Sequence, residues 1–282
     1  MTVRIIADSA CDMSSADHPQ LTVLPLTVAF GTTVYQDGVD LSHQRFYELL
    51  IESDELPSTG QVNPYAYTQA FEEAAAAGEE IVVIALSSKL SGTYQSAVTA
   101  AAEAQVPVRI VDTRNVTVGE HILVKYALQL LDQGFAAQEI ASKVEAVRDR
   151  VVVIGLLDTL EYLRRGGRIS GAVGAVGEML SIKPVVTVED GEVRVMGKAR
   201  GSKNGRNLLT KKIEEVGGAD FSMPIELGYA GLDDKLLRKY IQDSRALWEE
   251  YPGEDLPVHS VGATIGTHVG PGAIALAFFK RA

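Results

Sequence analysis

The chain has 282 residues, of which 46% are hydrophobic and 22% are charged, and its formal net charge at pH 7 is −11. This length accommodates one large or two medium domains, and the acidic balance argues against nucleic-acid binding. The single cysteine, Cys11, excludes an internal disulfide and a zinc site made of cysteines.

Strands and helices alternate in the first half of the chain. The pattern predicts strands at residues 2–9, 21–30, 80–88, 106–113 and 151–157. It predicts helices at residues 41–53, 63–78, 92–104, 119–133 and 136–149, with Ser42 and Asn63 as N-caps. Continuous apolar strands that alternate with helices are typical of a buried parallel sheet. The apolar runs are too short to span a bilayer and the first ten residues do not resemble a signal peptide, so we expect a cytoplasmic protein.

The second half of the chain has a different pattern. Two alternating strands within residues 184–200 are joined by the turn Glu189-Asp190-Gly191, which indicates a hairpin. Further strands are predicted at residues 223–230, 257–262 and 273–279, and helices at residues 202–217 and 233–250. We therefore expect an α/β protein with an N-terminal parallel-sheet domain, residues 1–155. A C-terminal α+β domain, residues 156–282, should contain a mixed or antiparallel sheet.

Three predicted strands end in polar residues, at Asp8, Ser87 and Asp112. Ligands of open parallel sheets bind beyond the carboxyl ends of the strands, so these residues should share one functional edge. Ser91 and Gly92 follow at the start of a helix, where unpaired N–H groups favour an anion. The sequence therefore predicts a site for a small anion here; the alternative is a simple helix cap. The Asp8 and Asp112 carboxylates are interpreted as loop caps rather than metal ligands.

Two other segments could contribute to this site. Residues 56–64 carry Thr59, Gly60 and Gln61 just before a predicted helix. Residues 262–276 contain four glycines around His268, and we expect them to form a glycine-rich loop that presents the imidazole to a ligand.

Two chemistries compete for Ser91 and His268. A Ser–His pair could act as the nucleophile and base of a serine hydrolase or acyltransferase. Alternatively, the hydroxyl, imidazole and backbone N–H groups could bind an anion without any reaction. The G-x-S-x-G motif of hydrolases is absent, which favours binding over catalysis. A phosphate-containing ligand also remains an alternative, because hydroxyl-rich loops at helix N-termini suit phosphate.

The charge is unevenly distributed. Residues 164–212 contain eleven Lys and Arg and four Asp and Glu, a local net charge of +7, whereas the remaining residues carry −18. This segment is interpreted either as solvated helix faces or as a surface for an anionic ligand or an acidic partner.

Five motifs together resemble one known family. "SSKLSGTYQSA", "VDTRN", "YLRRGGRISGA", "LSIKPVV" and "GTHVGPGAIAL" occur in this order along the whole chain. They resemble the DegV family, the FakB-type fatty-acid-binding proteins. The resemblance implies two α/β domains with one long-chain fatty acid, of the palmitate or stearate class, in a tunnel at their junction. It also implies a carrier with no catalytic residues, cofactor or metal, which presents the acyl carboxylate to a fatty acid kinase subunit.

The resemblance also implies roles for individual residues. Thr59, Ser91, Gly92 and His268 would bind the carboxylate, and Gly60, Arg168 and Arg200 would contact the headgroup or the kinase. Two positions depart from the family pattern: Gly60 replaces a hydroxyl residue, and Lys89 stands where glycine is usual. These departures concern the headgroup contacts rather than the class of protein.

Overall fold

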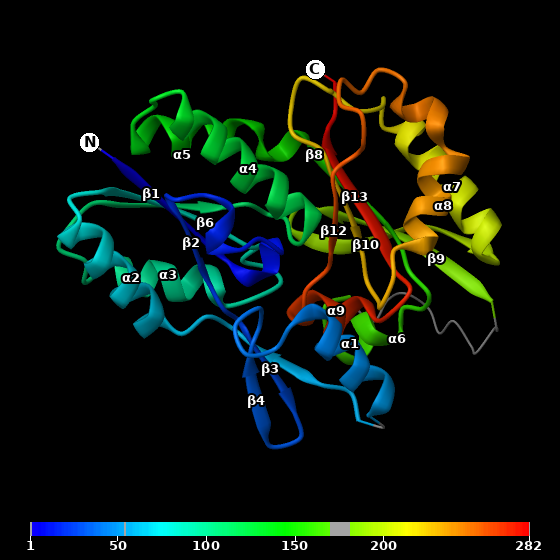
Figure 1. Cartoon of the computed structure of the whole chain (residues 1–282), viewed down its shortest axis with the longest axis horizontal. Helices are drawn as coiled ribbons and strands as arrows, with labels where there is room; N and C mark the ends of the chain where they lie inside the picture. Colours follow the sequence, from blue (N-terminus) through cyan, green and yellow to red (C-terminus); the bar gives the residue numbers. More distant parts are fainter. Residues whose placement is uncertain (1, 54, 170–180, 282) are drawn as a thin grey trace.

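The computed structural model describes residues 2–53, 55–169 and 181–281, whose strands form three sheets (Figure 1). The last three residues of the motif "YLRRGGRISGA" (170–172) and the first residue of the motif "LSIKPVV" (180) lie outside the described residues. Within the described part, no helix is long and apolar enough to cross a membrane.

The first sheet is parallel throughout, as predicted. Its strand order is β2-β1-β6-β7, and its strands are β1 (Val3–Asp8), β2 (Leu21–Leu24), β6 (Glu80–Ala85) and β7 (Val108–Asp112). Ala7 pairs with Ile84 and Ala85 with Asp112, so the polar residues that follow these strands lie at one edge of the sheet.

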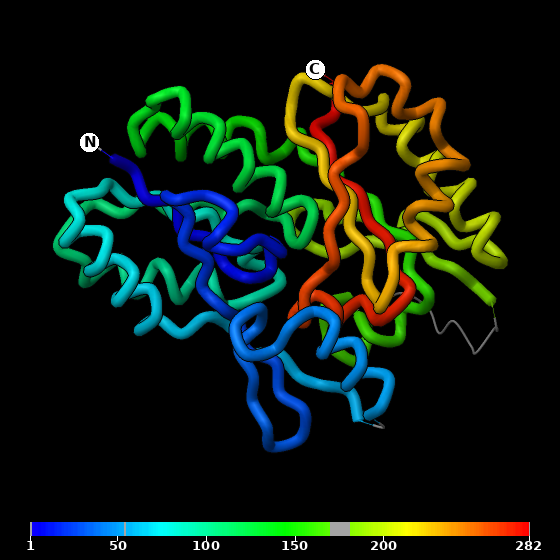
Figure 2. The backbone as a smooth tube through the Cα atoms, in the orientation of Figure 1, coloured from blue at the N-terminus to red at the C-terminus, as the bar shows by residue number. Residues whose placement is uncertain are grey.

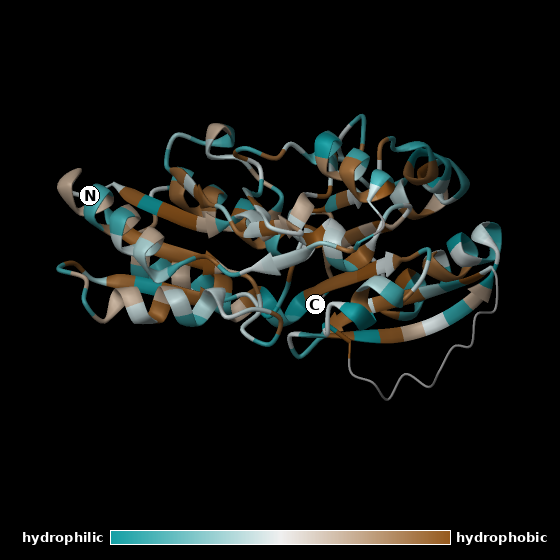
Figure 3. Ribbon diagram, turned by 90° about the horizontal axis from the view of Figure 1, so that it is seen from below, coloured by the Kyte–Doolittle hydropathy of each residue, from teal (hydrophilic) through white to brown (hydrophobic). Residues whose placement is uncertain are grey.

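Helices cover both faces of this sheet (Figure 1). One face is covered by α2 (Pro64–Ala76) and α3 (Thr93–Ala101), and the other by α4 (Val118–Asp132) and α5 (Ala137–Val147). Asn63 caps α2 as expected, since its side chain accepts the Tyr65 N–H at 2.9 Å. The strands are brown along most of their length in Figure 3, as expected for a sheet buried on both faces.

The second sheet is mixed and has the order β10-β9-β8-β13-β11-β12. Its strands are β8 (Val151–Leu156), β9 (Ile182–Glu189), β10 (Glu192–Arg200), β11 (Glu226–Tyr229), β12 (Val258–Ser260) and β13 (Ile274–Phe279). The pair β11–β12 is parallel and the others are antiparallel. α7 (Ser202–Glu215), α8 (Lys235–Asp243) and a 3-10 turn (Arg245–Trp248) pack on one face. The expected boundary at residue 155 falls inside β8, and the division into two domains stays a prediction.

Helix α4 joins the two large sheets. Its Ile122 and Leu123 pack in one cluster with Ile5 of β1 and with Phe279 of β13. The backbone trace in Figure 2 shows α4 between the N-terminal strands and the C-terminal β13, which is red. This contact brings the two parts of the chain into one continuous body.

A small third sheet lies beside both large sheets. Its order is β4-β3-β5, with β3 (Thr27–Phe30), β4 (Thr33–Gln36) and β5 (Ser58–Gly60). α9 (Ala263–Val269) packs against β3 and β5, and α1 (His43–Glu52) and α6 (Glu161–Arg165) pack against α9. The single strand expected at residues 21–30 is therefore wrong. The chain leaves the parallel sheet at Pro25, whose backbone cannot donate to a strand ladder.

Candidate functional site

A cavity of about 400 Å³ lies between the end of the parallel sheet and the six-stranded sheet. Ligand sites typically measure about 300–1,000 Å³. Most of the wall is apolar and comes from Leu26, Leu86, Leu90, Val116, Val153, Leu157, Leu163, Val186, Val188, Val193, Ile265, Val269 and Ala275. The β8, β9 and β13 residues among them face away from α7 and α8, so the cavity occupies the opposite face of that sheet.

Six of the seven predicted site residues line this cavity: Thr59, Gly60, Ser91, Gly92, Arg168 and His268. They come from β5, from the start of α3, from the segment after α6 and from α9, which are far apart in the sequence. The structure thus brings these six residues to one cavity, and their roles in binding stay predictions. Gln61, which directly follows Gly60 in the sequence, also lines the cavity.

The serines that follow β6 have different tasks. Ser87 is buried, and its hydroxyl donates to the carbonyl of Gly191 at 2.7 Å, which fastens the β9–β10 turn to the parallel sheet. Ser88 donates to Asp112 Oδ2 at 2.6 Å outside the cavity. Asp8 accepts the N–H groups of Ala10 and Leu86, so the interpretation of Asp8 and Asp112 as loop caps is confirmed.

Ser91 lies just before α3, whose N-cap is Gly92, and its hydroxyl accepts the first N–H of the helix. Its Oγ accepts the Thr93 N–H at 3.2 Å and lies 3.0 Å from Thr93 Oγ1. Thr93 Oγ1 also accepts the Val62 N–H at 3.2 Å, and in one arrangement of the Ser91–Thr93 pair its hydroxyl donates to Ser91. Ser91 Oγ then accepts two hydrogen bonds, and its remaining O–H can donate into the cavity.

Thr59 and His268 form the second polar pair of the site. Thr59 Oγ1 lies 2.9 Å from His268 Nε2, and His268 Nδ1 is buried without a hydrogen-bond partner among the described residues. Burial, assisted by the charge of Arg168, lowers the pKa of His268 to about 4. The imidazole is therefore neutral at pH 7. Because its Nε2 can donate to Thr59, the Thr59 hydroxyl proton is free to point to a ligand.

The predicted glycine-rich loop around His268 is wrong, because this segment contains the helix α9 and His268 lies in its last turn. Asp37 stabilises the helix start by accepting the N–H groups of Ala263 and Thr264 at 3.0 and 2.9 Å. A side chain 226 residues away in sequence supplies this cap, so local sequence signals could not reveal it. Gly266 lies so close to Phe46 that a Cβ would overlap the ring, which explains a glycine inside the helix.

Arg168 holds the site together rather than pointing freely into it. Its guanidinium donates to the carbonyls of Leu90 and Gly166 at 3.1 and 2.6 Å. It thereby ties the segment after α6 to the loop before α3.

Close packing explains the two glycines of the site. A Cβ at Gly92 would overlap the Gln61 amide, which donates to Ser96 at 2.8 Å. A Cβ at Gly60 would overlap Thr27 Oγ1 on the paired strand β3. Position 60 has no side-chain hydroxyl, but the hydroxyl of Thr27 lies beside it on β3.

Arg200 is the predicted residue that the structure does not bring to the cavity. It is exposed at the last residue of β10 and pairs with Ile182, whereas the β9–β10 turn lies at the other end of that strand. Arg200 lies eight residue steps along the strand from Glu192, roughly 27 Å at the usual rise.

A second hollow of about 500 Å³ lies at the surface and shares Leu90, Ser91, Gly92 and Arg168 with the cavity. Ser88, Lys89, Tyr94 and Gln95 complete its wall. The polar end of the cavity therefore lies directly beneath this surface hollow.

Comparison with known proteins gives a consistent result. A sequence model of the family described as "Uncharacterised protein, DegV family" matches residues 2–281. A DegV domain-containing protein of Clostridium perfringens is 35% identical over 286 residues, covering 97% of this chain and 96% of that protein.

Two solved structures share the whole fold. A DegV family protein from Thermus thermophilus, described by its fatty acid binding, is 30% identical with a TM-score of 0.88 and full coverage of both chains. A DegV lipid-binding protein from Thermotoga maritima is 26% identical with a TM-score of 0.85 and 98% coverage of each chain.

The fold and the site define an α/β ligand-binding protein with a mostly apolar cavity. The chain belongs to the DegV family.

Proposed function

We propose that this protein binds one long-chain fatty acid, with the acyl chain in the apolar part of the cavity and the carboxylate at Ser91, Gly92, Thr59 and His268. The observation that carries this proposal is a mostly apolar cavity in which Thr59, Ser91 and His268 lie together with the backbone of Gly92, although Thr117, Thr187 and Thr264 also line it. The fatty acid binding of the Thermus thermophilus relative supports it.

The polar end of the cavity suits the carboxylate of a fatty acid that must later dissociate from the protein. A carboxylate that loses water needs several hydrogen-bond donors, because an unpaired buried charge is very unfavourable. Ser91 and Thr59 each offer an O–H, while His268 is neutral. Arg168 uses two of its five N–H groups for the carbonyls of Leu90 and Gly166, so its remaining donors can also reach the carboxylate.

The apolar walls suit the acyl chain. Each buried CH₂ contributes roughly 0.8 kcal/mol, so about fourteen would contribute on the order of 11 kcal/mol before ordering costs. Most of the affinity should therefore come from the chain, and the headgroup should fix its direction. A phosphate-containing polar ligand would leave this apolar wall unused.

We further propose that the protein is a carrier that presents the carboxylate to a fatty acid kinase subunit, which would transfer phosphate from ATP to form the acyl phosphate. The surface hollow over Ser91 and Gly92 supports this idea, since it brings the polar end close to the outside. The resemblance of the sequence motifs to FakB-type proteins points the same way.

The geometry gives less support to a serine hydrolase. Ser91 Oγ is engaged with Thr93, and His268 Nε2 with Thr59. No hydrogen bond joins Ser91 to His268 among the described residues, and no carboxylate there bonds His268 Nδ1 to orient it. An activity-based serine probe should therefore leave Ser91 unlabelled.

Calorimetric titration of the delipidated protein tests the binding proposal. Palmitate should bind at one site, methyl palmitate should bind at least about tenfold more weakly because it lacks the charged acceptor, and inorganic phosphate should give no heat. Binding of phosphate without binding of palmitate would overturn the proposal.

A further inference from the structure

One glycine of the cavity wall has no packing reason to be a glycine. Gly155 lies in the interior of β8, where a glycine weakens the strand because it has no side chain to pack. Its φ angle is outside the left-handed region, so a larger residue could take the same backbone conformation. The atoms nearest to a Cβ at this position would be Val186 Cγ2 at 3.5 Å, the Ile274 carbonyl oxygen at 3.6 Å and Ala275 Cβ at 3.8 Å. These are ordinary van der Waals distances, so the fold leaves room for a side chain that the sequence lacks.

The other glycines among the described residues are different. Each of them either has a positive φ angle or would bring a Cβ to within 3.1 Å of another atom, which is closer than ordinary contact. Gly60 and Gly92, which also line the cavity, belong to the second kind. Backbone conformation or close packing therefore explains those glycines, whereas the glycine at position 155 needs another reason.

A side chain at position 155 would point into the cavity. Successive side chains of a strand point to opposite faces of the sheet. Val153 and Leu157 line the cavity, whereas Ile154 and Leu156 pack on the opposite face, beneath α7 and α8. Position 155 therefore faces the cavity, and Gly155 itself is one of the lining residues.

The two residues paired with Gly155 lie on the same face. Gly155 is directly opposite Val186 of β9 and Ala275 of β13, and both of them line the cavity. Side chains that are directly opposite on antiparallel strands share a face and lie about 4.5–5.5 Å apart. The small side chain of Ala275 therefore widens the cavity further at this level. Ala275 is paired in turn with Gly228 of β11.

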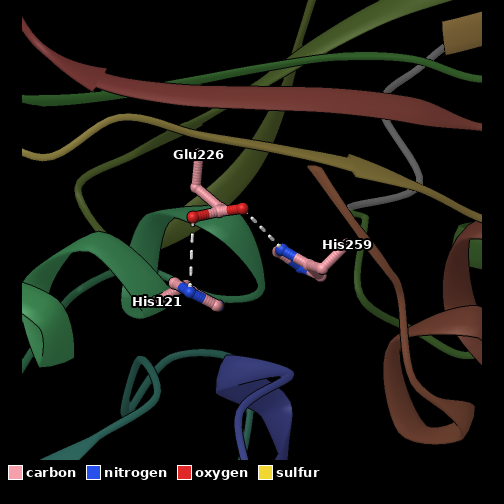
Figure 4. Close-up of side chains that lie close together, drawn as sticks. All are labelled: His121, Glu226 and His259. Carbon is pink, nitrogen blue, oxygen red and sulfur yellow. Dashed lines mark hydrogen bonds and ion pairs between the residues drawn. The ribbon is translucent and has the colours of Figure 1, made fainter. Parts of the chain in front are cut away.

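Farther across this face of the sheet, α4 fills the space. A Cβ at Gly228 would come within 2.9 Å of Val118 of α4, so this glycine is explained by the packed helix. On β12, His259 stacks on His121 of α4 with 4.6 Å between the ring centres, beside Glu226 (Figure 4). The unfilled volume in front of Gly155 is therefore a feature of the cavity and not of the whole face of the sheet.

We propose that Gly155 sets the length of the acyl chain that the cavity accepts, an inference that rests on the proposed binding of a fatty acid. The C-terminal end of β8 leads to α6 and then to Arg168, which bonds the loop before Ser91. An acyl chain whose carboxylate lies at Ser91 passes Gly155 before it reaches Val153, nearer the start of β8. The missing side chain leaves this path open, and a larger residue would close it.

A series of substitutions at position 155 tests this role by calorimetry of the delipidated, full-length protein with palmitate and with laurate, which is four carbons shorter. Each methylene that loses its place in the cavity should weaken binding about fourfold. Gly155→Ala, Gly155→Val and Gly155→Leu add one, three and four carbon atoms. The Kd for palmitate should therefore rise roughly 4-, 60- and 200-fold, while the Kd for laurate should change less than about fourfold. The preference of the wild-type protein for palmitate over laurate, about 200-fold, should disappear in Gly155→Leu.

Stability separates this role from a structural one. Because valine suits a strand better than glycine does, ligand-free Gly155→Val should resist urea at least as well as the wild-type protein. Val152→Leu is the matched control, since it enlarges a side chain of the same strand on the opposite face of the sheet. It should leave the ratio of the palmitate and laurate Kd values unchanged.

The outcomes distinguish this inference from the proposed function. A wild-type protein that binds neither acid would show that the proposed function is wrong, and the role of Gly155 with it. If the wild-type protein prefers palmitate and Gly155→Leu keeps that preference, only the role of Gly155 is overturned. The same holds if Val152→Leu lowers the preference as much as Gly155→Leu does. If Gly155→Leu does not fold, Gly155→Ala decides: a roughly fourfold drop in the preference supports the proposal, and an unchanged preference overturns it.

Discussion

At the level of single residues, the site depends on where protons point. Ser91 Oγ accepts the Thr93 N–H, and Thr59 Oγ1 lies 2.9 Å from His268 Nε2, so the O–H of Thr59 can face the cavity when the imidazole is the donor. The residue types could be read from the sequence, but the supporting contacts of Thr93 and Gln61 could not, because they depend on packing between α3 and the segment before α2.

Removal of the Ser91 hydroxyl should weaken fatty acid binding. Ser91→Ala loses a hydrogen bond to a charged group, worth about 1.5–3 kcal/mol or roughly a 10- to 150-fold rise in Kd. Calorimetry with palmitate measures the change. Thr99→Ala removes an exposed hydroxyl from the same helix and should have no effect. An unchanged Kd for Ser91→Ala would show that this serine is only a helix cap.

Protonation of His268 should make the ligand-free protein less stable in mild acid. Burial lowers the pKa of His268 to about 4 in the folded protein, below the usual value near 6.5 in the unfolded chain. Between these values the unfolded chain binds more protons, so stability falls as the pH falls. From pH 7.5 to 5.5 the wild-type protein should lose about 1 kcal/mol more than His268→Gln. Urea unfolding at both pH values tests this, and equal losses would contradict it.

At the level of secondary-structure elements, local patterns predicted most of the fold. The strands of the parallel sheet, the β9–β10 hairpin and the caps Ser42 and Asn63 were found as expected, because their signals lie within a few residues. The helices α6 and α9 and the short strands β4 and β5 were missed, and β3 was predicted only as a continuation of β2. They depend on distant partners, such as Asp37 for α9 and the cross-strand pairing of Val28 with Thr59.

Loss of the Asp37 cap should affect both stability and binding. Asp37→Ala leaves two buried N–H groups of α9 without their acceptor, which should lower the free energy of unfolding by about 1–3 kcal/mol. It should also raise the Kd for palmitate by misplacing His268, although Asp37 is not among the lining residues. Asp40→Ala removes the carboxylate of an exposed turn three residues away and serves as the control. Equal effects of both variants would refute a specific role for Asp37 in positioning α9.

At the level of the whole molecule, the two sheets place the cavity between them. The resemblance to a known family predicted a long-chain fatty acid as the ligand, whereas the residues alone predicted only an anion site at a sheet edge. The contacts of Glu226 with His121 and His259 were not foreseen, because the three residues are separated by more than 30 residues in the sequence. The basic segment at residues 164–212 is partly neutralised, since Arg164 and Arg165 both pair with Glu161.

Charge reversal in the basic segment should slow transfer to a kinase partner. Arg164 and Arg165 are 65% and 63% exposed, and Arg200 is exposed as well. Replacement of these three by Glu should lower the rate of carrier-dependent acyl phosphate formation by about tenfold, more strongly at low salt. Binding of palmitate should not change. Lys235→Glu, at the start of α8, is the control, and an unchanged rate in the triple variant would exclude this segment as the docking surface.

The central claim is that the cavity holds a long-chain fatty acid, and the most direct measurement is mass spectrometry of the lipid bound to the protein. The protein should be purified without added lipid and extracted with organic solvent. We predict a nearly stoichiometric fatty acid in the C14–C18 range, with its chain length set by the apolar wall. An empty protein that also fails to take up added palmitate would contradict the account.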